Sequence, residues 1–353
     1  MSRIHLFNPE NDLALAQGTV CYTPPSHAAA LHRAGALLPA WWAREGDAII
    51  APREMAGELS ELRERYGLKG EIVSSSAGLV PDPWGWSADT VRQFAAAGVG
   101  RETLPSAAKI ERLRMLSHRR TSVEILQALG RGDLAAVETS DPDEVVALEA
   151  ASPGCYVKSP WSCSGRGVFC ASALTPEVLR TRAAGLIRRQ GSVMVERGVR
   201  GKTLDLAALY RAERGEVTFA GLSVFVAEER GTYGGNIVAP QQWLRDYIGH
   251  HVSLTVVDDV IAAHARVLTA VVGPYYEGWL GIDMLASPAG LHPCIELNLR
   301  RTMGVVAMEV ASRLTVPPSL MSWTLGTPPG SYPLLPPHEG FTLGLRRLTK
   351  NKI

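Results

Sequence analysis

The 353-residue chain has few cysteines, no long apolar run and no excess of charge of either sign. No apolar run reaches the roughly 20 residues that span a bilayer, and the amino terminus lacks a signal-peptide apolar core. The five cysteines are scattered and include no Cys-x-x-Cys pair, which argues against a disulfide framework and structural zinc. With 36 basic and 35 acidic side chains, no overall field for nucleic acid or an anionic membrane is expected. We therefore expect a soluble, cytoplasmic protein with small-molecule partners, no nucleic acid and no membrane.

A chain of this length is expected to form two or three domains. Over residues 1 to about 105, short apolar runs alternate with helical patterns, which predicts β-α-β units and a small parallel sheet. The expected strands are residues 4–7, 48–51 and 71–74, and the expected helices are 26–34, capped by its serine, and 53–66. No Gly-x-Gly-x-x-Gly follows the first strand, so a dinucleotide-binding fingerprint is absent. The polar segment Asn8–Asp12 stands there instead, where open sheets usually bind ligands; a helix cap and turn explains it equally well.

A predicted strand from Cys155 ends at Lys158 and is followed by a loop rich in serine and glycine. Glycines allow consecutive backbone N–H groups to converge on an anion, and Arg166 adds a charged fork. The alternative is an ordinary hairpin turn with a solvated arginine. The position of Lys158 in an apolar strand just before the turn favours a polyphosphate site. Cys163 lies in the same loop, but no base stands near it in sequence to activate it as a nucleophile.

A second glycine-containing segment, Gly198 to Thr203, ends like a P-loop. That motif requires a glycine at position 196, where Glu196 stands, and a following helix. Residues 204–210 have strand character instead, so we reject a P-loop. We interpret Glu196, at the end of an apolar strand, as part of a hinge whose backbone pairs with a purine edge.

Two further short strands present oxygen ligands. Asp283 stands on the first and Glu296, thirteen residues later, on the second. A hairpin-like connection would bring both carboxylates to one face, and Asn298 shares the face of Glu296 because it is two residues away. Such ligands hold one or two Mg²⁺ ions. The alternative is a strand pair held by salt bridges to Arg300 and its neighbour.

Over residues 106 to about 320, these motifs resemble the ATP-grasp superfamily. The lysine and its glycine loop, the hinge at 193–196 and the Gly-Ile-Asp and Ile-Glu-Leu-Asn motifs carry the resemblance. It implies a chain of α/β and α+β class, in which a Rossmann-like pre-grasp domain precedes a two-lobed ATP-grasp fold. The expected parts are a pre-grasp domain at 1–105, a small lobe with the phosphate loop at 106–198, a large lobe with the metal site at 199–325, and a Pro/Gly-rich surface extension at 326–353.

The resemblance also assigns roles to single residues. Arg119 stands where these enzymes usually carry a second phosphate-binding lysine, which keeps the charge but changes the geometry. Thr203 occupies the usual place of a ribose-binding glutamate, and Asp205 is expected to take over that role. The predicted catalytic residues are Lys158 and Arg300, the latter holding the reacting acyl phosphate. The implied nucleotide site is Arg119, Lys158, Ser164, Gly165, Arg166, Gly167, Val168, Glu196, Arg197, Val199 and Asp205, and the implied metal ligands are Asp283, Glu296 and Asn298.

The activity that the resemblance implies is ATP-dependent ligation, in which a carboxylate becomes an acyl phosphate that an amine or thiol attacks. ATP and Mg²⁺, or Mn²⁺ in its place, are the implied cofactors, and a small carboxylate and a small amine are the substrates. A small-molecule phosphotransferase and a nucleotide-binding protein without turnover are the alternatives. The sequence leaves the substrates and the oligomeric state open, and a homo-oligomer is compatible with it. It also leaves open whether Gly231–Asn236 is a lid, a turn that grips the substrate or a plain surface loop.

Overall fold

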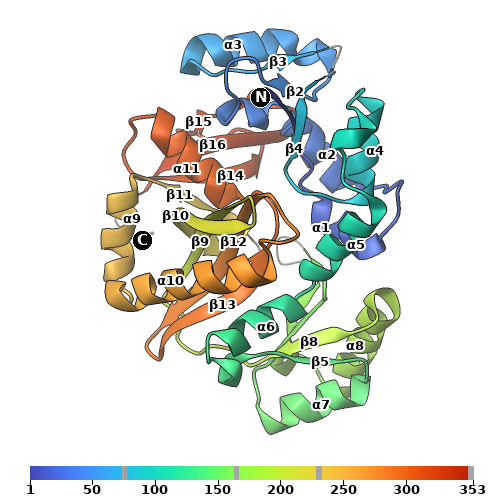
Figure 1. The fold of residues 1–353 in the computed structure, drawn as a ribbon. Helices are drawn as coiled ribbons and strands as arrows, with labels where there is room; N and C mark the ends of the chain where they lie inside the picture. The colour runs from blue at the N-terminus through green and yellow to red at the C-terminus, as the bar shows by residue number, and fades with distance from the viewer. Residues whose placement is uncertain (74–75, 77, 163–166, 228–232, 349–353) are drawn as a thin grey trace.

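A computed structural model of the protein describes residues 1–73, 76, 78–162, 167–227 and 233–348. Over these ranges the strands form three sheets. Figure 1 shows the amino-terminal elements at one end of the molecule, the large sheet in the middle and the segment around residues 130–196 at the other end. None of the helices in these ranges is both long and apolar enough to cross a membrane.

The amino-terminal sheet is parallel, as the alternating pattern predicts. Its strands run in the order β3-β2-β1-β4. They are β1 (Arg3–Leu6), β2 (Ala48–Ile49), β3 (Glu71–Ile72) and β4 (Val80–Pro83). The accompanying helices are α1 (Asn11–Gln17), α2 (Ser26–Ala34), η1 (Leu38–Trp41), η2 (Arg53–Met55), α3 (Ala56–Tyr66), α4 (Ala88–Ala96) and η3 (Arg101–Thr103). The expected serine cap of α2 is wrong, because Pro25 holds the cap position and no side chain caps the helix.

The second sheet is antiparallel and has the order β5-β8-β6-β7. Its strands are β5 (Val137–Thr139), β6 (Tyr156–Lys158), β7 (Val168–Cys170) and β8 (Val193–Glu196). The helices of this part are α5 (Ala107–Leu116), α6 (Arg120–Ala128), η4 (Gly132–Leu134), α7 (Pro142–Ala151), η5 (Ala171–Ala173) and α8 (Pro176–Gln190). A small core joins α7 and α8 to strands β6 and β8. Lys158 is the last residue of its strand, as predicted.

The large sheet has eight strands in the order β13-β12-β9-β10-β11-β14-β16-β15. They are β9 (Leu204–Glu213), β10 (Glu216–Ala227), β11 (Tyr233–Val238), β12 (Gly278–Ser287), β13 (Gly290–Asn298), β14 (Ser319–Leu325), β15 (Tyr332–Pro333) and β16 (Phe341–Arg347). Three helices accompany the sheet: α9 (Gln241–Gly249), α10 (Leu254–Val271) and α11 (Met303–Arg313). Because β9 begins at Leu204, a strand stands where a P-loop would require a helix.

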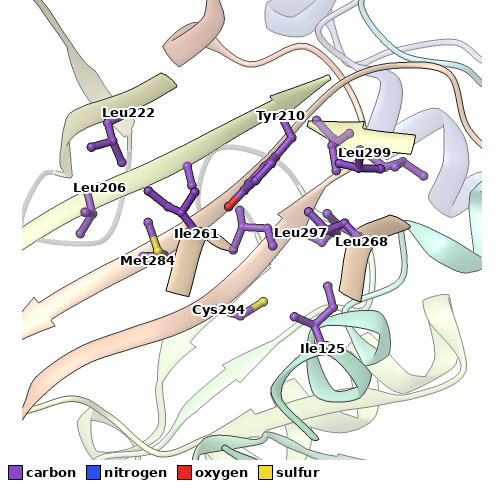
Figure 2. Packing of buried hydrophobic residues seen from close by; sticks show 14 of the residues in the cluster. Ile125, Leu206, Tyr210, Leu222, Ile261, Leu268, Met284, Cys294, Leu297 and Leu299 are labelled. Atoms are coloured by element: carbon purple, nitrogen blue, oxygen red, sulfur yellow. The ribbon is translucent and has the colours of Figure 1, made fainter. Parts of the chain in front are cut away.

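Alternate residues of the central strands face two different layers. Tyr210 and Met284 pack with Ile261 and Leu268 of α10, and the edge of this core reaches Ile125 of α6 (Figure 2). The intervening residues of β9, such as Leu209, pack against α11 instead. Asp283 is opposite Ala207 of this second set. The predicted metal ligands therefore lie on the sheet face that α11 partly covers.

The expectation of a surface extension at the carboxyl terminus is wrong. Strand β14 pairs with β11 and β16, and β15 pairs with β16. Leu334, Leu343 and Leu345 are buried in a core shared with amino-terminal tryptophans. Within Gly231–Asn236, which the sequence leaves open, Tyr233–Asn236 belong to β11 and Asn236 is buried; residues 231 and 232 lie outside the described ranges.

Candidate active site

Asp283 and Glu296 stand directly opposite each other on the antiparallel strands β12 and β13, and Gly281 is opposite Asn298. Burial, and then the negative charge of Glu296, raise the pKa of Asp283 to about 7. Two carboxylates in such proximity repel each other unless a cation lies between them. The hairpin expected from the thirteen-residue spacing is thus present.

This set of oxygens suits a divalent cation of the Mg²⁺ type. Such an ion binds through one or two carboxylates, and substrate phosphates and water complete its shell. Within the described ranges no group of three His, Cys, Asp or Glu side chains is placed to hold a metal. The candidate set consists instead of two carboxylates, Asp283 and Glu296, and the amide oxygen of Asn298.

Arg119 connects Glu296 to the segment that follows Lys158. It lies immediately before α6, and its Nη2 is 2.9 Å from Oε1 of Glu296. The same guanidinium donates from Nε to the carbonyl of Ser159 (3.0 Å) and from Nη2 to Oγ of Ser162 (2.9 Å). A planar fork can hold these three partners at once, whereas a lysine ammonium is a point charge. The arginine at this position therefore joins the small antiparallel sheet to the edge strand of the large one.

Lys158 is paired with a carboxylate of the neighbouring strand, and its contact with phosphate stays a prediction. Its Nζ is 2.6 Å from Oε2 of Glu196, on the neighbouring strand β8, and both side chains are largely buried. The lysine therefore pairs with the hinge carboxylate, while Arg119 makes the contact with Glu296. Arg197 and Val199 follow β8 directly, and Gly198 between them packs so closely on the carbonyl of Gly154 that a Cβ would be 2.3 Å from it.

The two ends of the predicted phosphate loop are joined by a backbone hydrogen bond from Ser159 N to the carbonyl of Gly167 (2.8 Å). Gly167 has a φ of +74°, and a Cβ on it would stand 2.3 Å from Oγ of Ser159, so only glycine fits. Val168 begins β7. Ser164, Gly165 and Arg166, with Cys163, lie outside the described residues, so their contact with phosphate stays a prediction.

Asp205 lies on the same sheet face as the predicted metal ligands, because it is opposite Leu285, which is two residues from Asp283. Its Oδ2 is 2.6 Å from Nζ of Lys202. Thr203 donates its hydroxyl to the carbonyl of Ala286 (3.2 Å) and is thus used within the fold. The ribose contact of Asp205 remains a prediction, and this geometry leaves Asp205 better placed for it than Thr203.

Arg300 joins the predicted metal site to the amino-terminal elements. Its Nη2 donates to Oδ1 of Asn298 (2.8 Å) and its Nε donates to Oδ2 of Asp12 (2.7 Å). Asn8 has a structural role, because its Nδ2 lies 2.9 Å from both the Gly85 carbonyl and Oγ1 of Thr90. In the polar segment after the first strand, Asn8 therefore stabilises the local backbone, and Asp12 contacts Arg300 at the predicted site. Sequence reasoning noted the segment but not the partner of Asp12.

The neighbouring Arg301 is buried in a second link to the amino-terminal sheet. Its Nη2 donates to Oδ2 of Asp82 (3.0 Å), and the ring of His5 lies between Asp82 (2.9 Å) and Asp47 (3.1 Å). The backbone N–H of Arg301 donates to the carbonyl of Trp84 (2.8 Å). Burial acts to raise the pKa of Asp82, but the Arg301 guanidinium and His5 outweigh it and hold that pKa well below its usual range.

The Asp12→Asn variant is expected to lower the turnover of the proposed reaction about tenfold to a hundredfold, because a charge-assisted hydrogen bond that orients Arg300 is weakened. Steady-state kinetics should show the loss in kcat or in the KM of the carboxylate, with urea unfolding showing that the variant remains folded. Glu111→Gln, which removes the exposed carboxylate paired with Arg114, is the matched control. Full activity of Asp12→Asn would show that Arg300 keeps its orientation without this carboxylate.

No protein-family model matches the chain, and no curated protein matches it in sequence. In three dimensions it is similar to N5-carboxyaminoimidazole synthetase from Staphylococcus aureus, solved with ADP, at a TM-score of 0.51 and 12% identity. That match covers 99% of this chain and 93% of the synthetase. Biotin carboxylase from Campylobacter jejuni, solved as a β-γ-ATP complex, gives a TM-score of 0.50 at 12% identity over 93% of this chain and 77% of the carboxylase. Both are ATP-grasp proteins, and this chain has the ATP-grasp fold.

Proposed function

We propose that the protein is an ATP-dependent ligase that activates a small carboxylate as an acyl phosphate for attack by an amine or a thiol. The observation that carries the proposal is the pairing of Asp283 with Glu296 on adjacent strands, with Arg119 2.9 Å from Glu296. A fold that holds ADP and an ATP analogue in two structural neighbours supports it.

The proposed division of the chain follows its sheets. Residues 1–105, with their parallel sheet, would be the Rossmann-like pre-grasp domain that helps to bind the acceptor. Residues 106–198 and 199–325 would be the small and large lobes, and the strands beyond residue 325 complete the large sheet. On this division, Asp12 is the contribution of the pre-grasp domain to the site through Arg300.

Each group at the site has a task that its chemistry permits. Bound MgATP would supply the phosphoryl group, with Mg²⁺ or Mn²⁺ held by Asp283, Glu296 and Asn298. Arg119 lies beside Glu296 and Lys158 lies beside Glu196 of the hinge, and both would stabilise the charge that develops on the transferred group. Arg300, oriented by Asp12, would hold the carboxylate substrate by its guanidinium.

Release of ADP in the presence of a panel of small carboxylic acids and amines tests this proposal. ADP release should require Mg²⁺ and an acid, and hydroxylamine added in place of the amine should trap the acyl phosphate as a hydroxamate. A phosphorylated product that can be isolated would instead identify a phosphotransferase. Nucleotide binding without ADP release from any combination would contradict an enzymatic role.

A further inference from the structure

A groove lies between strand β7 and helix α8, away from the groups to which the proposed reaction assigns a task. Its volume is about 380 Å³, and its lining includes Phe169 of β7 and Arg182, Gly185, Leu186 and Arg189 of α8. Sites for small organic molecules have volumes in this range. The groove is therefore a possible ligand site that the ligase proposal leaves unassigned.

The pairing of the strands separates the groove from the predicted phosphate-binding lysine. Phe169 is opposite Val157, so both side chains point to the same face of the small antiparallel sheet, where Val157 is buried against α7 and α8. Lys158, the next residue of β6, points to the other face and contacts Glu196. A ligand in the groove would thus lie on the opposite side of this sheet from Lys158.

Two arginines of α8 give the groove a positive charge. Arg182 and Arg189 are seven residues apart, which is two helical turns, so they stand on one face of the helix. Both side chains are exposed, and neither is paired with a carboxylate of the described residues; the guanidinium of Arg182 lies 5.7 Å from the centre of the Phe169 ring. Arg180, by contrast, is paired with Asp143. Two such guanidiniums can share one dianion through forked hydrogen bonds.

The helix surface between these arginines leaves room for an apolar group. Leu186 is buried there, and Phe169 packs against the same core from β7. A Cβ on Gly185 would meet no atom closer than 3.9 Å, and this glycine does not have a positive φ. Glycine inside a helix is destabilising relative to alanine, and neither close packing nor backbone conformation requires it here. What Gly185 provides is space in the groove.

We propose that this groove is a second ligand site, which binds a small organic phosphate through Arg182 and Arg189. The apolar part of the ligand would lie over Gly185, against Leu186 and Phe169. A phosphate monoester fits the two arginines better than a carboxylate, because it carries up to two charges near pH 7 and three acceptor oxygens. The ligand is distinct from the nucleotide of the proposed reaction, so the site does not depend on that proposal.

Calorimetric titration of the full chain with phenyl phosphate, in the absence and in the presence of saturating MgADP, tests this proposal. The probe should bind under both conditions. It should bind more tightly than inorganic phosphate, which lacks the ring, and than phenol, which lacks the charge. Arg182→Gln and Arg189→Gln should each weaken its binding about tenfold, the loss expected when a hydrogen bond between charged groups is removed.

Gly185→Leu tests the groove without a change of charge. The leucine side chain would fill the space over position 185, so the affinity for phenyl phosphate should fall at least as far as in the arginine variants. The midpoint of urea unfolding should not fall, because leucine favours a helix more than glycine does. Gly185→Ala, which adds only the Cβ, should keep the fold and show a smaller loss of affinity.

Arg180→Gln is the matched control. It removes the same charge from the same helix, but Arg180 is paired with Asp143 and does not line the groove, so the affinity for the probe should stay the same. Equal losses in Arg180→Gln and Arg182→Gln, complete displacement of the probe by MgADP, or equal affinity for inorganic phosphate would overturn the proposal and leave the ligase proposal standing. Folded protein that binds phenyl phosphate in the groove but no nucleotide would support the second site and contradict only the proposed function.

Discussion

Asp283→Asn is expected to lower the turnover of the proposed reaction roughly a thousandfold, because Asp283 is proposed to hold the Mg²⁺ ion whose charge would stabilise the transferred phosphoryl group, an effect of several kcal/mol. The variant keeps the size of the side chain and its place opposite Glu296. The substitution replaces the negative carboxylate, which the proposed Mg²⁺ ion would bind, with a neutral amide. Mg²⁺-dependent ADP release, measured over a range of Mg²⁺ concentrations, is the readout. The affinity for MgADP should fall with the turnover, while circular dichroism and the radius of the folded protein stay the same.

The stability of the metal-free protein provides an independent check on Asp283. Its pKa is raised from 3.8 to about 7 in the folded state. A raised carboxyl pKa stabilises the fold below the unfolded value, and this contribution is lost as the pH rises through the folded value. Wild-type protein should therefore lose stability relative to Asp283→Asn as the pH rises from about 4 to about 7. Glu213→Gln, at the exposed end of β9, is the matched control. Full turnover by Asp283→Asn would remove the metal assignment.

The parts of the site that the sequence predicts are those that local patterns determine. The spacing of Asp283 and Glu296 around a turn predicts a hairpin, and alternation along the strand places both on one face. Lys158 ends its strand because an apolar run stops there and a glycine-rich loop follows. These features depend on neighbours in the chain, so the pattern is sufficient to find them.

The contacts that sequence reasoning missed depend on packing between distant segments. Arg300 and Asp12 are 288 residues apart, and Arg119 meets Glu296 only because α6 lies beside β13. No periodicity encodes these pairs. The signal in the sequence was Asp12 itself, a carboxylate directly after the first strand for which the local pattern gives no partner.

The carboxyl-terminal strands were missed for a different reason. Proline and glycine are dense beyond Pro317 and normally indicate turns. Strand β16 forms nevertheless, because it pairs with β14 along seven residues and buries Leu343 and Leu345. A Cβ on Gly344 would be 2.3 Å from Oγ of Ser331, so a larger residue there would displace that side chain. Tertiary pairing thus overrides the local composition.

Asp82→Ala is expected to lower the free energy of unfolding by about 3 to 5 kcal/mol, because it leaves a buried guanidinium without its partner. Arg301 donates to Asp82 at 3.0 Å, and both side chains are less than one-tenth exposed. The ring of His5 loses the same partner. Urea unfolding at pH 7 gives the comparison. Asp258→Ala, which removes the partner of the exposed Arg245, is the matched control and should cost no more than about 1 kcal/mol.

The pH dependence of this loss separates the ion pair from simple packing. The pKa of Asp82 is lowered in the folded state, so the contribution of the pair is present above the unfolded value of 3.8 and is lost as the pH falls below it. The difference in stability between wild type and Asp82→Ala should therefore shrink below about pH 4, while a packing defect would persist. Because Arg301 also donates its backbone N–H to Trp84 and adjoins Arg300, a loosened pair should reduce turnover as well. Equal losses in Asp82→Ala and Asp258→Ala would show that the buried pair does not hold the amino-terminal sheet to the site.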